Sequence, residues 1–182
     1  SLALFLCGGY MTGSDWRYYE LLYYEINWNN INFYPDEKLF YLFMLLTKYF
    51  VNDFFVFLIL VKLVVFYIYY SFFKTYSSNI FYSYFLFGPL FALFLFVDNP
   101  LRYMMALGFV VISYRFIINQ HLLKFTLILL IGTFFHYTVI LFFPFYFIAK
   151  IRLPNKILIP GFIAWFFLFT SNNLLSVITL FN

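Results

Sequence analysis

Long apolar runs are the feature that most restricts how this chain of 182 residues can fold. Four of them cover 54–73, 80–97, 101–118 and 125–149, the last broken by Pro144, and about 20 apolar residues suffice for a helix to cross the core of a bilayer. Only 10% of the residues are charged and 65% are apolar, whereas a soluble domain has about 25% charged and about 45–50% apolar residues. Lipid is therefore the main solvent of this chain. That excludes cytosolic enzymes, nucleic-acid-binding proteins and secreted disulfide scaffolds.

The apolar runs predict helices, because they lack the strict apolar–polar alternation of a membrane β-barrel. We expect an all-α fold, a polytopic transmembrane helix bundle with a short outer juxtamembrane helical loop. Residues 1–182 are expected to form a single integral membrane domain, with the outer loop over 8–53 and spanning helices over 54–182. The short apolar runs at the two ends, 2–7 and 174–181, predict that the chain is a piece of a longer protein.

The segment 38–51 decides on which side of the membrane each loop lies. It is too short to cross a core of about 30 Å, so we predict a helix lying at the interface, with a short span as the alternative. The interface helix puts Lys74, Arg115 and Lys124 inside, as the positive-inside rule requires, but leaves the basic loop 150–156 outside. A short span reverses every one of these assignments.

The one polar stretch, 8–38, holds five of the seven acidic residues and is predicted to lie outside. Within it, Ser14 or Asp15 can cap a helix over 16–27. One face of that helix would carry Tyr19, Leu22, Tyr23 and Ile26. An aspartate at a helix start is most often a simple cap. The functional interpretation is that Asp15 lies at the mouth of a membrane cavity and acts as general base on a sugar hydroxyl.

The residues that follow Asp15 are candidates for substrate binding. Arg17, Tyr18 and Tyr19 can bind polar or sugar groups, and Trp16 can stack on the face of a sugar. Their alternative role is to anchor the helix at the depth of the lipid headgroups.

Two polar residues lie inside or at the edge of the apolar runs. Arg102 can snorkel to the surface, pair with Asp98, or face a cavity and bind a phosphate or diphosphate through its planar guanidinium. His136 can bond a neighbouring helix, or it can orient Asp15, donate to a phosphate or act as an acid. We take Asp15, Arg102 and His136 as the candidate catalytic residues.

Four short motifs occur in a characteristic order along the chain: Gly13-Ser14-Asp15-Trp16 with Tyr19, Glu37-Lys38-Leu39-Phe40, Asn99-Pro100-Leu101-Arg102, and Phe135-His136-Tyr137. In this order the sequence resembles the EpsG-type, Wzy-like polysaccharide polymerases of bacterial envelopes, from about residue 13 to residue 149. Asp15, Arg102 and His136 match motif positions of that family.

The resemblance implies a membrane glycosyltransferase that joins polyprenyl-diphosphate-linked oligosaccharide repeat units into a surface polysaccharide such as a capsule, O-antigen or exopolysaccharide. Donor and acceptor would both be lipid-linked, and other polysaccharide-assembly proteins would be further partners, with no nucleic acid involved. The protein would cross the bacterial inner membrane several times, with its active site toward the periplasm or the cell exterior. A single direct displacement would invert the anomeric configuration.

We expect no metal and no cofactor, because no carboxylate cluster has the spacing of a metal site and Cys7 is the single cysteine. Two other classes of protein stay open. A transporter or flippase of lipid-linked sugars would use broken helices such as those at Gly88-Pro89 and Pro160-Gly161. In a non-catalytic membrane subunit, Asp15 would be only a helix cap.

Overall fold

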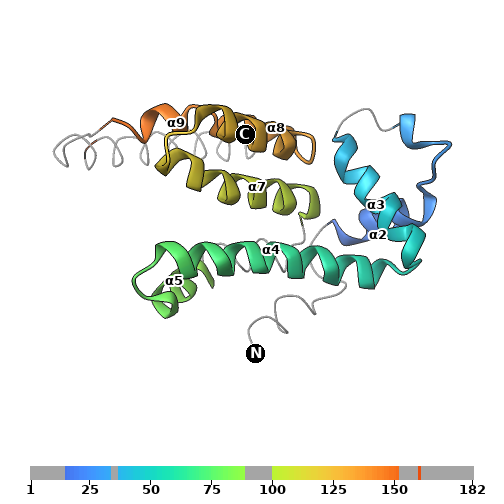
Figure 1. Ribbon diagram of the computed structural model, residues 1–182. Helices are drawn as coiled ribbons and strands as arrows, with labels where there is room; N and C mark the ends of the chain where they lie inside the picture. Colours follow the sequence, from blue (N-terminus) through green and yellow to red (C-terminus); the bar gives the residue numbers. More distant parts are fainter. Residues whose placement is uncertain (1–14, 34–36, 89–99, 152–159, 161–182) are drawn as a thin grey trace, which may run out of the picture. The chain divides into compact units, whose positions relative to one another are not determined.

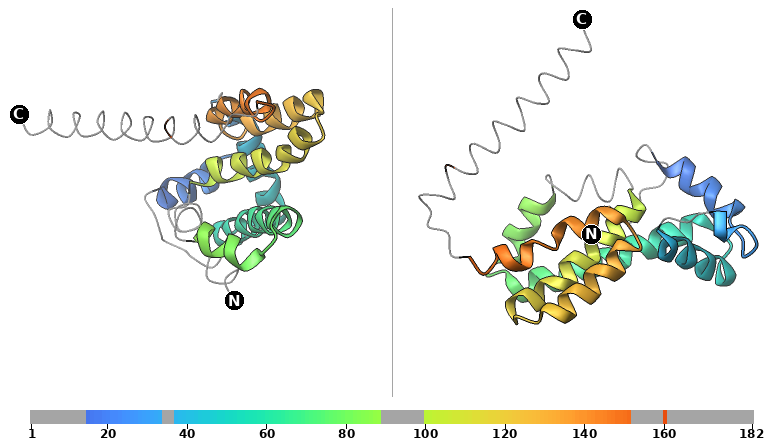
Figure 2. Two further views of the ribbon diagram at one scale, coloured as in Figure 1. Left: turned by 90° about the vertical axis from the view of Figure 1, so that its left-hand side faces the viewer. Right: turned by 90° about the horizontal axis from the view of Figure 1, so that it is seen from above.

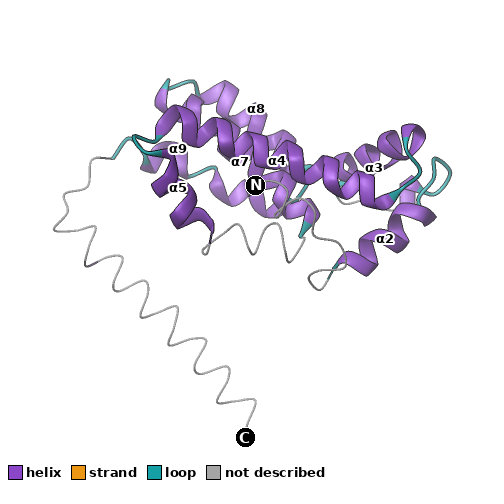
Figure 3. Ribbon diagram, turned by 90° about the horizontal axis from the view of Figure 1, so that it is seen from below, coloured by secondary structure: helices purple, strands orange, loops and turns teal. Residues whose placement is uncertain are grey.

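A computed structural model describes most of the chain, and every element that it describes is helix or loop (Figure 3). The described residues are 15–33, 37–88, 100–151 and 160. They belong to two compact units, residues 1–146 and 147–182, and the elements below lie in the first unit unless stated. Several sequence predictions lie outside the described residues: those on 2–7, Cys7, Ser14, 89–97, Asp98, 152–156, Gly161 and 174–181.

Two described helices are long and apolar enough to cross a membrane. They are α4 (Phe54–Tyr76) and α7 (Leu101–Ile118), and both begin at the residue that the apolar pattern predicts. Helix α7 packs against α4 and against α8 (Leu122–Thr133). The colours of Figure 1 show that α4 and α7 run in the same direction, and the further views of Figure 2 show them alongside each other.

Two shorter helices, α2 (Trp16–Glu25) and α3 (Lys38–Phe50), pack on the first half of α4. A 3-10 turn, η1 (Ile31–Phe33), lies between them in the chain. The ammonium of Lys48 donates to the carbonyls of Tyr24 and Ile26 at 2.7 and 3.0 Å, so α3 satisfies carbonyls that α2 leaves open at its end. Thirteen residues of helix reach about 20 Å, which is too short for α3 to cross a bilayer core by itself.

The prediction that four residues share one face of α2 is confirmed, because all four are buried together in the protein core. The buried residues are Tyr19, Leu22, Tyr23 and Ile26. The ring of Tyr23 packs 5.2 Å from that of Phe57 in α4, and its hydroxyl donates to the carbonyl of Val51 at 2.6 Å. This face therefore packs against protein rather than lying among lipid headgroups.

The second half of α4 packs against α5 (Ile80–Phe87). The side chain of Asn79 accepts from the amides of Phe81 and Tyr82 and caps the helix start. The rings of Tyr69 and Phe87 stack with their centroids 4.7 Å apart. A helix therefore begins where the apolar run 80–97 predicts one.

The spanning segment expected over 125–149, with its break at Pro144, is wrong, because the helix ends earlier. Helix α8 ends at Thr133, and the chain then continues as the 3-10 helix η3 (Tyr137–Phe142) and the short helix α9 (Phe145–Ile148), which crosses the boundary between the two units. The ring of Phe125 lies 5.2 Å from that of Tyr146. A continuous helix would separate them by about 30 Å. The segment is therefore a hairpin, in which η3 packs back against α8 and His136 lies at the tip.

Close packing and one backbone bond stabilise this hairpin. A side chain on Gly132 would lie only 3.0 Å from Phe109 of α7 and 3.2 Å from Val139 of η3, so the lack of a Cβ allows α8 to approach both. At the turn, the amide of Leu39 donates to the carbonyl of Phe134 at 3.3 Å. The open first turn of α3 and the open end of α8 thereby satisfy each other.

The Gly132→Ala variant is expected to lose about 1–3 kcal/mol of stability, because an added methyl overpacks a site with no room for it. The thermal unfolding midpoint of the purified protein in detergent measures the loss. Gly88→Ala is the matched control, since a Cβ at Gly88 meets no described atom within 4 Å. Equal midpoints for the two variants would contradict the close packing of the hairpin.

Candidate functional site

A single carboxylate, that of Glu37, joins the arginine and the histidine that the sequence singles out. The guanidinium of Arg102 donates from Nη1 to Glu37 Oε2 at 2.7 Å. His136 bonds through Nδ1 to the other carboxylate oxygen, Oε1. The three residues come from the start of α3, the first turn of α7 and the tip of the hairpin. We call them the Glu37 cluster.

Glu37 occupies an unfavourable position for a glutamate. Its side chain is only 4% exposed, and burial of a carboxylate is costly unless it is paired. Its backbone is left-handed, with φ 57° and ψ 39°, which is uncommon for a residue other than glycine. It is the N-cap residue of α3, yet its side chain makes no cap hydrogen bond. Such strain is typical of a functional site, where the surrounding contacts must hold the residue in place.

Arg102 is held by α2 as well as by Glu37. Its Nε donates to the hydroxyl of Tyr19 at 3.2 Å, and its guanidinium lies 5.7 and 6.0 Å from the ring centres of Tyr19 and Tyr18. These are cation–π distances. Among the described residues, its hydrogen bonds use two of the three guanidinium nitrogens, so Nη2 can donate to a ligand. The side chain of Arg102 is 30% exposed, so a ligand can reach it.

The bond to Glu37 fixes the orientation of the His136 ring. In the neutral tautomer that donates from Nδ1 to the carboxylate, Nε2 is the acceptor nitrogen of the ring. The rings of Tyr103 and Tyr137 meet the imidazole edge-on, 5.5 and 5.1 Å away. A neutral imidazole held in this way can take a proton at Nε2.

Two buried tyrosines keep the surroundings of Arg102 neutral. Burial raises the pKa of Tyr19 above its usual value, although the nearby Arg102 opposes the shift. Burial likewise raises the pKa of Tyr41 to about 12. Both hydroxyls therefore stay protonated at neutral pH. The carboxylate of Glu37 is the group that forms an ion pair with Arg102.

Asp15 lies exposed at the N-cap position of α2, one turn before Tyr18 and Tyr19. Its side chain makes no cap hydrogen bond, so the capping role considered for it is not realised. Its charge contributes to the raised pKa of Tyr19, which places it near the Arg102 side of the cluster. Trp16 and Arg17 pack on each other, with the guanidinium 5.3 Å from the ring centre.

The structure thus brings Arg102 and His136 together, but through a residue that the sequence argument did not select. Glu37 appeared there only as part of a motif, and its partners lie 65 and 99 residues further along the chain. From the sequence, His136 was a candidate to orient Asp15, but in the structure it bonds Glu37. Asp98, the partner considered for Arg102, lies outside the described residues. The only local signal for Glu37 was its place in the four-motif order.

The chemistry available at the Glu37 cluster is binding of an anion by Arg102 beside a base at His136. In the described part of the chain, no group of three or more His, Cys, Asp or Glu side chains could hold a metal ion. Independence of metal stays a prediction.

The comparisons with known proteins identify one family. The model of the EpsG family matches residues 1–182. No curated protein and no solved structure matches the chain.

Proposed function

The chain belongs to the EpsG family, a Wzy-like polymerase family of polysaccharide biosynthesis, and on that premise we propose that it is a membrane glycosyltransferase. Its substrates would be polyprenyl-diphosphate-linked oligosaccharides, which it would join into a surface polysaccharide. The observation that carries this proposal is the Glu37 cluster, because it combines an anion-binding arginine with an oriented base.

The transfer can be written as one displacement. The acceptor hydroxyl attacks the anomeric carbon of the donor sugar, and its proton passes to Nε2 of His136. The bond between that carbon and the diphosphate oxygen breaks, and the lipid diphosphate leaves with the electron pair. Arg102 stabilises the charge that develops on the leaving group, an effect worth several kcal/mol when the donor is already aimed. Attack from the face opposite the leaving group inverts the anomeric configuration.

Glu37 is a positioning residue in this scheme, because it acts through Arg102 and His136. Asp15, exposed near Tyr18 and Tyr19, would hold hydroxyl groups of the acceptor. The sequence instead predicted Asp15 as the general base. We assign the base to His136, because the carboxylate of Glu37 orients its ring.

The hairpin also supports a membrane orientation with the site outside. If α8 enters the membrane and η3 returns, the basic residues after α9 emerge on the side where α8 began. The bases Lys74, Arg115 and Lys124 then fall inside, and the chain that leads to the basic loop returns to the same side. The conflict with the positive-inside rule that a single span over 125–149 creates disappears. The Glu37 cluster, at the opposite end of α7, would face the periplasm or the cell exterior of an inner-membrane protein that spans several times.

Cysteine labelling in intact cells tests this orientation. In a Cys7→Ser background, Ser78→Cys and Lys150→Cys are expected to react only after the membrane is permeabilised, and Asn29→Cys to react with an impermeant reagent from outside. All three positions are exposed loop or turn residues. Labelling of the Lys150→Cys variant from outside would restore the single span and contradict the hairpin as a re-entrant element.

The variants Asp15→Asn and His136→Ala separate the two candidate bases. Loss of a general base costs about 10²–10⁴ in rate, so His136→Ala is expected to lose elongation by that factor. Asp15→Asn is expected to raise the KM for the acceptor about tenfold, with kcat little changed, because one charge-assisted hydrogen bond is lost. If Asp15→Asn instead lowers kcat as much as His136→Ala does, Asp15 is the base and the role given to His136 is wrong.

Reconstitution decides the class of protein. The purified full-length protein in proteoliposomes receives a lipid-linked oligosaccharide, and the lengths of the glycan products are measured on gels. The transferase proposal predicts longer glycans. Transport of unchanged substrate across the vesicle would favour a flippase, and neither activity would favour a non-catalytic subunit; both results would overturn the proposal.

A further inference from the structure

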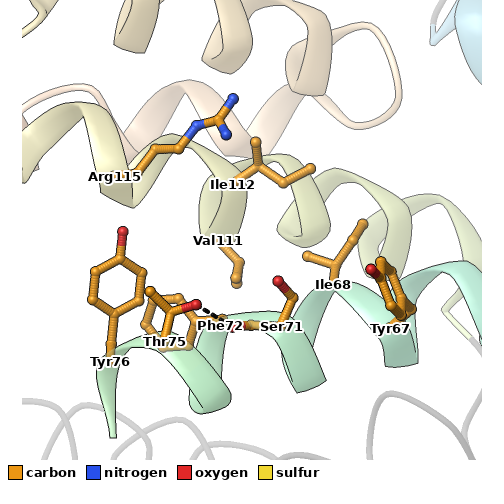
Figure 4. Close-up of a pocket in the computed structure, with 9 residues that line it drawn as sticks. All are labelled: Tyr67, Ile68, Ser71, Phe72, Thr75, Tyr76, Val111, Ile112 and Arg115. Carbon is orange, nitrogen blue, oxygen red and sulfur yellow. Dashed lines mark hydrogen bonds between the residues drawn. The ribbon is translucent and has the colours of Figure 1, made fainter.

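A second site lies between the two candidate spanning helices, away from the Glu37 cluster. A cavity of about 480 Å³ opens between the second half of α4 and the last turns of α7 (Figure 4). We call it the α4–α7 cavity. Its lining residues are Tyr67, Ile68, Ser71, Phe72, Thr75, Tyr76, Val111, Ile112 and Arg115.

Hydroxyl groups and one guanidinium supply the polar part of the lining. Figure 4 shows the side chains of Ser71 and Tyr76 rising from α4 toward α7, and the side chain of Arg115 extending from α7 with its guanidinium on the side away from α4 in this view. The hydroxyl of Thr75 donates to the carbonyl of Ser71 at 2.8 Å, which leaves its lone pairs free to accept. None of the described residues that line the cavity is acidic, so the charge of Arg115 has no carboxylate within the site.

The rest of the lining is apolar and aromatic. Ile68, Val111 and Ile112 supply aliphatic lining. Two lining rings, those of Phe72 and Tyr76, pack against the ring of Tyr114 at centroid distances of 5.3 and 5.1 Å. A ligand that fits this lining has an anionic head beside an apolar body. A small free anion would leave the apolar wall unfilled.

The position along the helices matches the depth of lipid headgroups. Arg115 lies in the last turn of α7 and Tyr76 is the last residue of α4. Arg115 follows Arg102 by 13 residues, which is about 20 Å along the helix axis. The α4–α7 cavity is therefore near the opposite end of α7 from the Glu37 cluster.

We propose that the α4–α7 cavity binds the phosphate headgroup of an anionic phospholipid, of the phosphatidylglycerol class. Arg115 pairs with the phosphate, since a guanidinium matches two phosphate oxygens at once. The hydroxyls of Tyr76 and Ser71 bond the headgroup, and an acyl chain lies along Ile68 and Val111. The proposal rests on α4 and α7 spanning the membrane, and not on glycosyl transfer.

Lipid binding by the purified protein tests this proposal without any sugar substrate. Binding of phosphatidylglycerol in neutral detergent micelles is measured by native mass spectrometry for wild type, Arg115→Ala, Tyr76→Phe and Lys124→Ala. Arg115→Ala is expected to weaken binding about tenfold or more, as loss of one charge-assisted pair predicts. Tyr76→Phe removes one hydroxyl and should weaken binding by a smaller factor. Lys124 is exposed and lies outside the cavity, so Lys124→Ala should bind as wild type.

Three results would overturn the proposal. Equal losses in Arg115→Ala and Lys124→Ala would mean general attraction of the lipid by positive charge. Equal binding of phosphatidylcholine, which carries a phosphate but no net charge, would remove the requirement for an anionic lipid. Displacement of the lipid by millimolar inorganic phosphate would show a site for the free anion. If Arg115→Ala fails to fold, unchanged lipid binding by Tyr76→Phe contradicts the headgroup contact.

Discussion

Replacement of Glu37 by glutamine is expected to abolish measurable elongation, the largest effect of any single substitution in this protein. Glutamine keeps the shape of the side chain but removes the charge that Arg102 and His136 share. Removing one partner of a buried ion pair costs about 3–5 kcal/mol, and the cost here lies toward the lower end because Arg102 and His136 are partly exposed. Arg102 and the His136 ring would both lose their fixed orientation.

The elongation rate of Glu37→Gln, compared with its thermal unfolding midpoint, checks this expectation. Glu25→Gln is the matched control, because Glu25 is an exposed glutamate at the end of α2. A positioning role predicts a further signature: the pH profile of any residual activity should change, because the orientation of His136 is lost. A folded Glu37→Gln protein that elongates at the wild-type rate would remove Glu37 from the site.

Loss of the Arg102 guanidinium is expected to lower kcat about 10²–10³-fold, the range found when one preorganised donor to a developing negative charge is removed. In the Arg102→Ala variant nothing replaces the donor at Nη2, and Glu37 keeps only His136. Arg102→Lys should recover part of the rate, because an ammonium keeps the charge but cannot bond Glu37, Tyr19 and a diphosphate in one plane.

Single-turnover rates with a lipid-linked donor measure this effect separately from binding. Lys124→Ala, an exposed cation on the neighbouring helix, serves as the control for lost positive charge. If Arg102→Ala raises only the KM for the donor and leaves kcat unchanged, Arg102 binds the lipid diphosphate equally before and during the reaction. The stabilisation of the leaving group would then be wrong.

The two candidate spanning helices were predictable because their signal is local. Helix α7 begins and ends at the predicted residues, Leu101 and Ile118, and α4 begins at Phe54 and extends three residues past its predicted end. An apolar run of this length between polar residues has one favourable solution in lipid, whatever the rest of the chain does. The buried face of α2 follows from helical spacing alone in the same way.

The hairpin and the Glu37 cluster depend on contacts between distant residues, and so the sequence did not predict them. Residues 134–136 contain no proline or glycine to end a helix. The turn there rests instead on the close approach at Gly132 and the bond from Leu39 to Phe134. The same turn brings His136 to Glu37, so an incorrect single helix over 125–149 also hid the partner of its histidine.

The stoichiometry of product release tests the central claim most directly. The purified protein is supplied with a lipid-linked oligosaccharide, and both new glycosidic bonds and released polyprenyl diphosphate are counted in wild type and in Glu37→Gln. A glycosyl transfer at the Glu37 cluster predicts one diphosphate lipid for each new bond in wild type, and neither product in the folded variant. Equal amounts of both products from the variant and the wild type would contradict the assignment of this cluster as the active site.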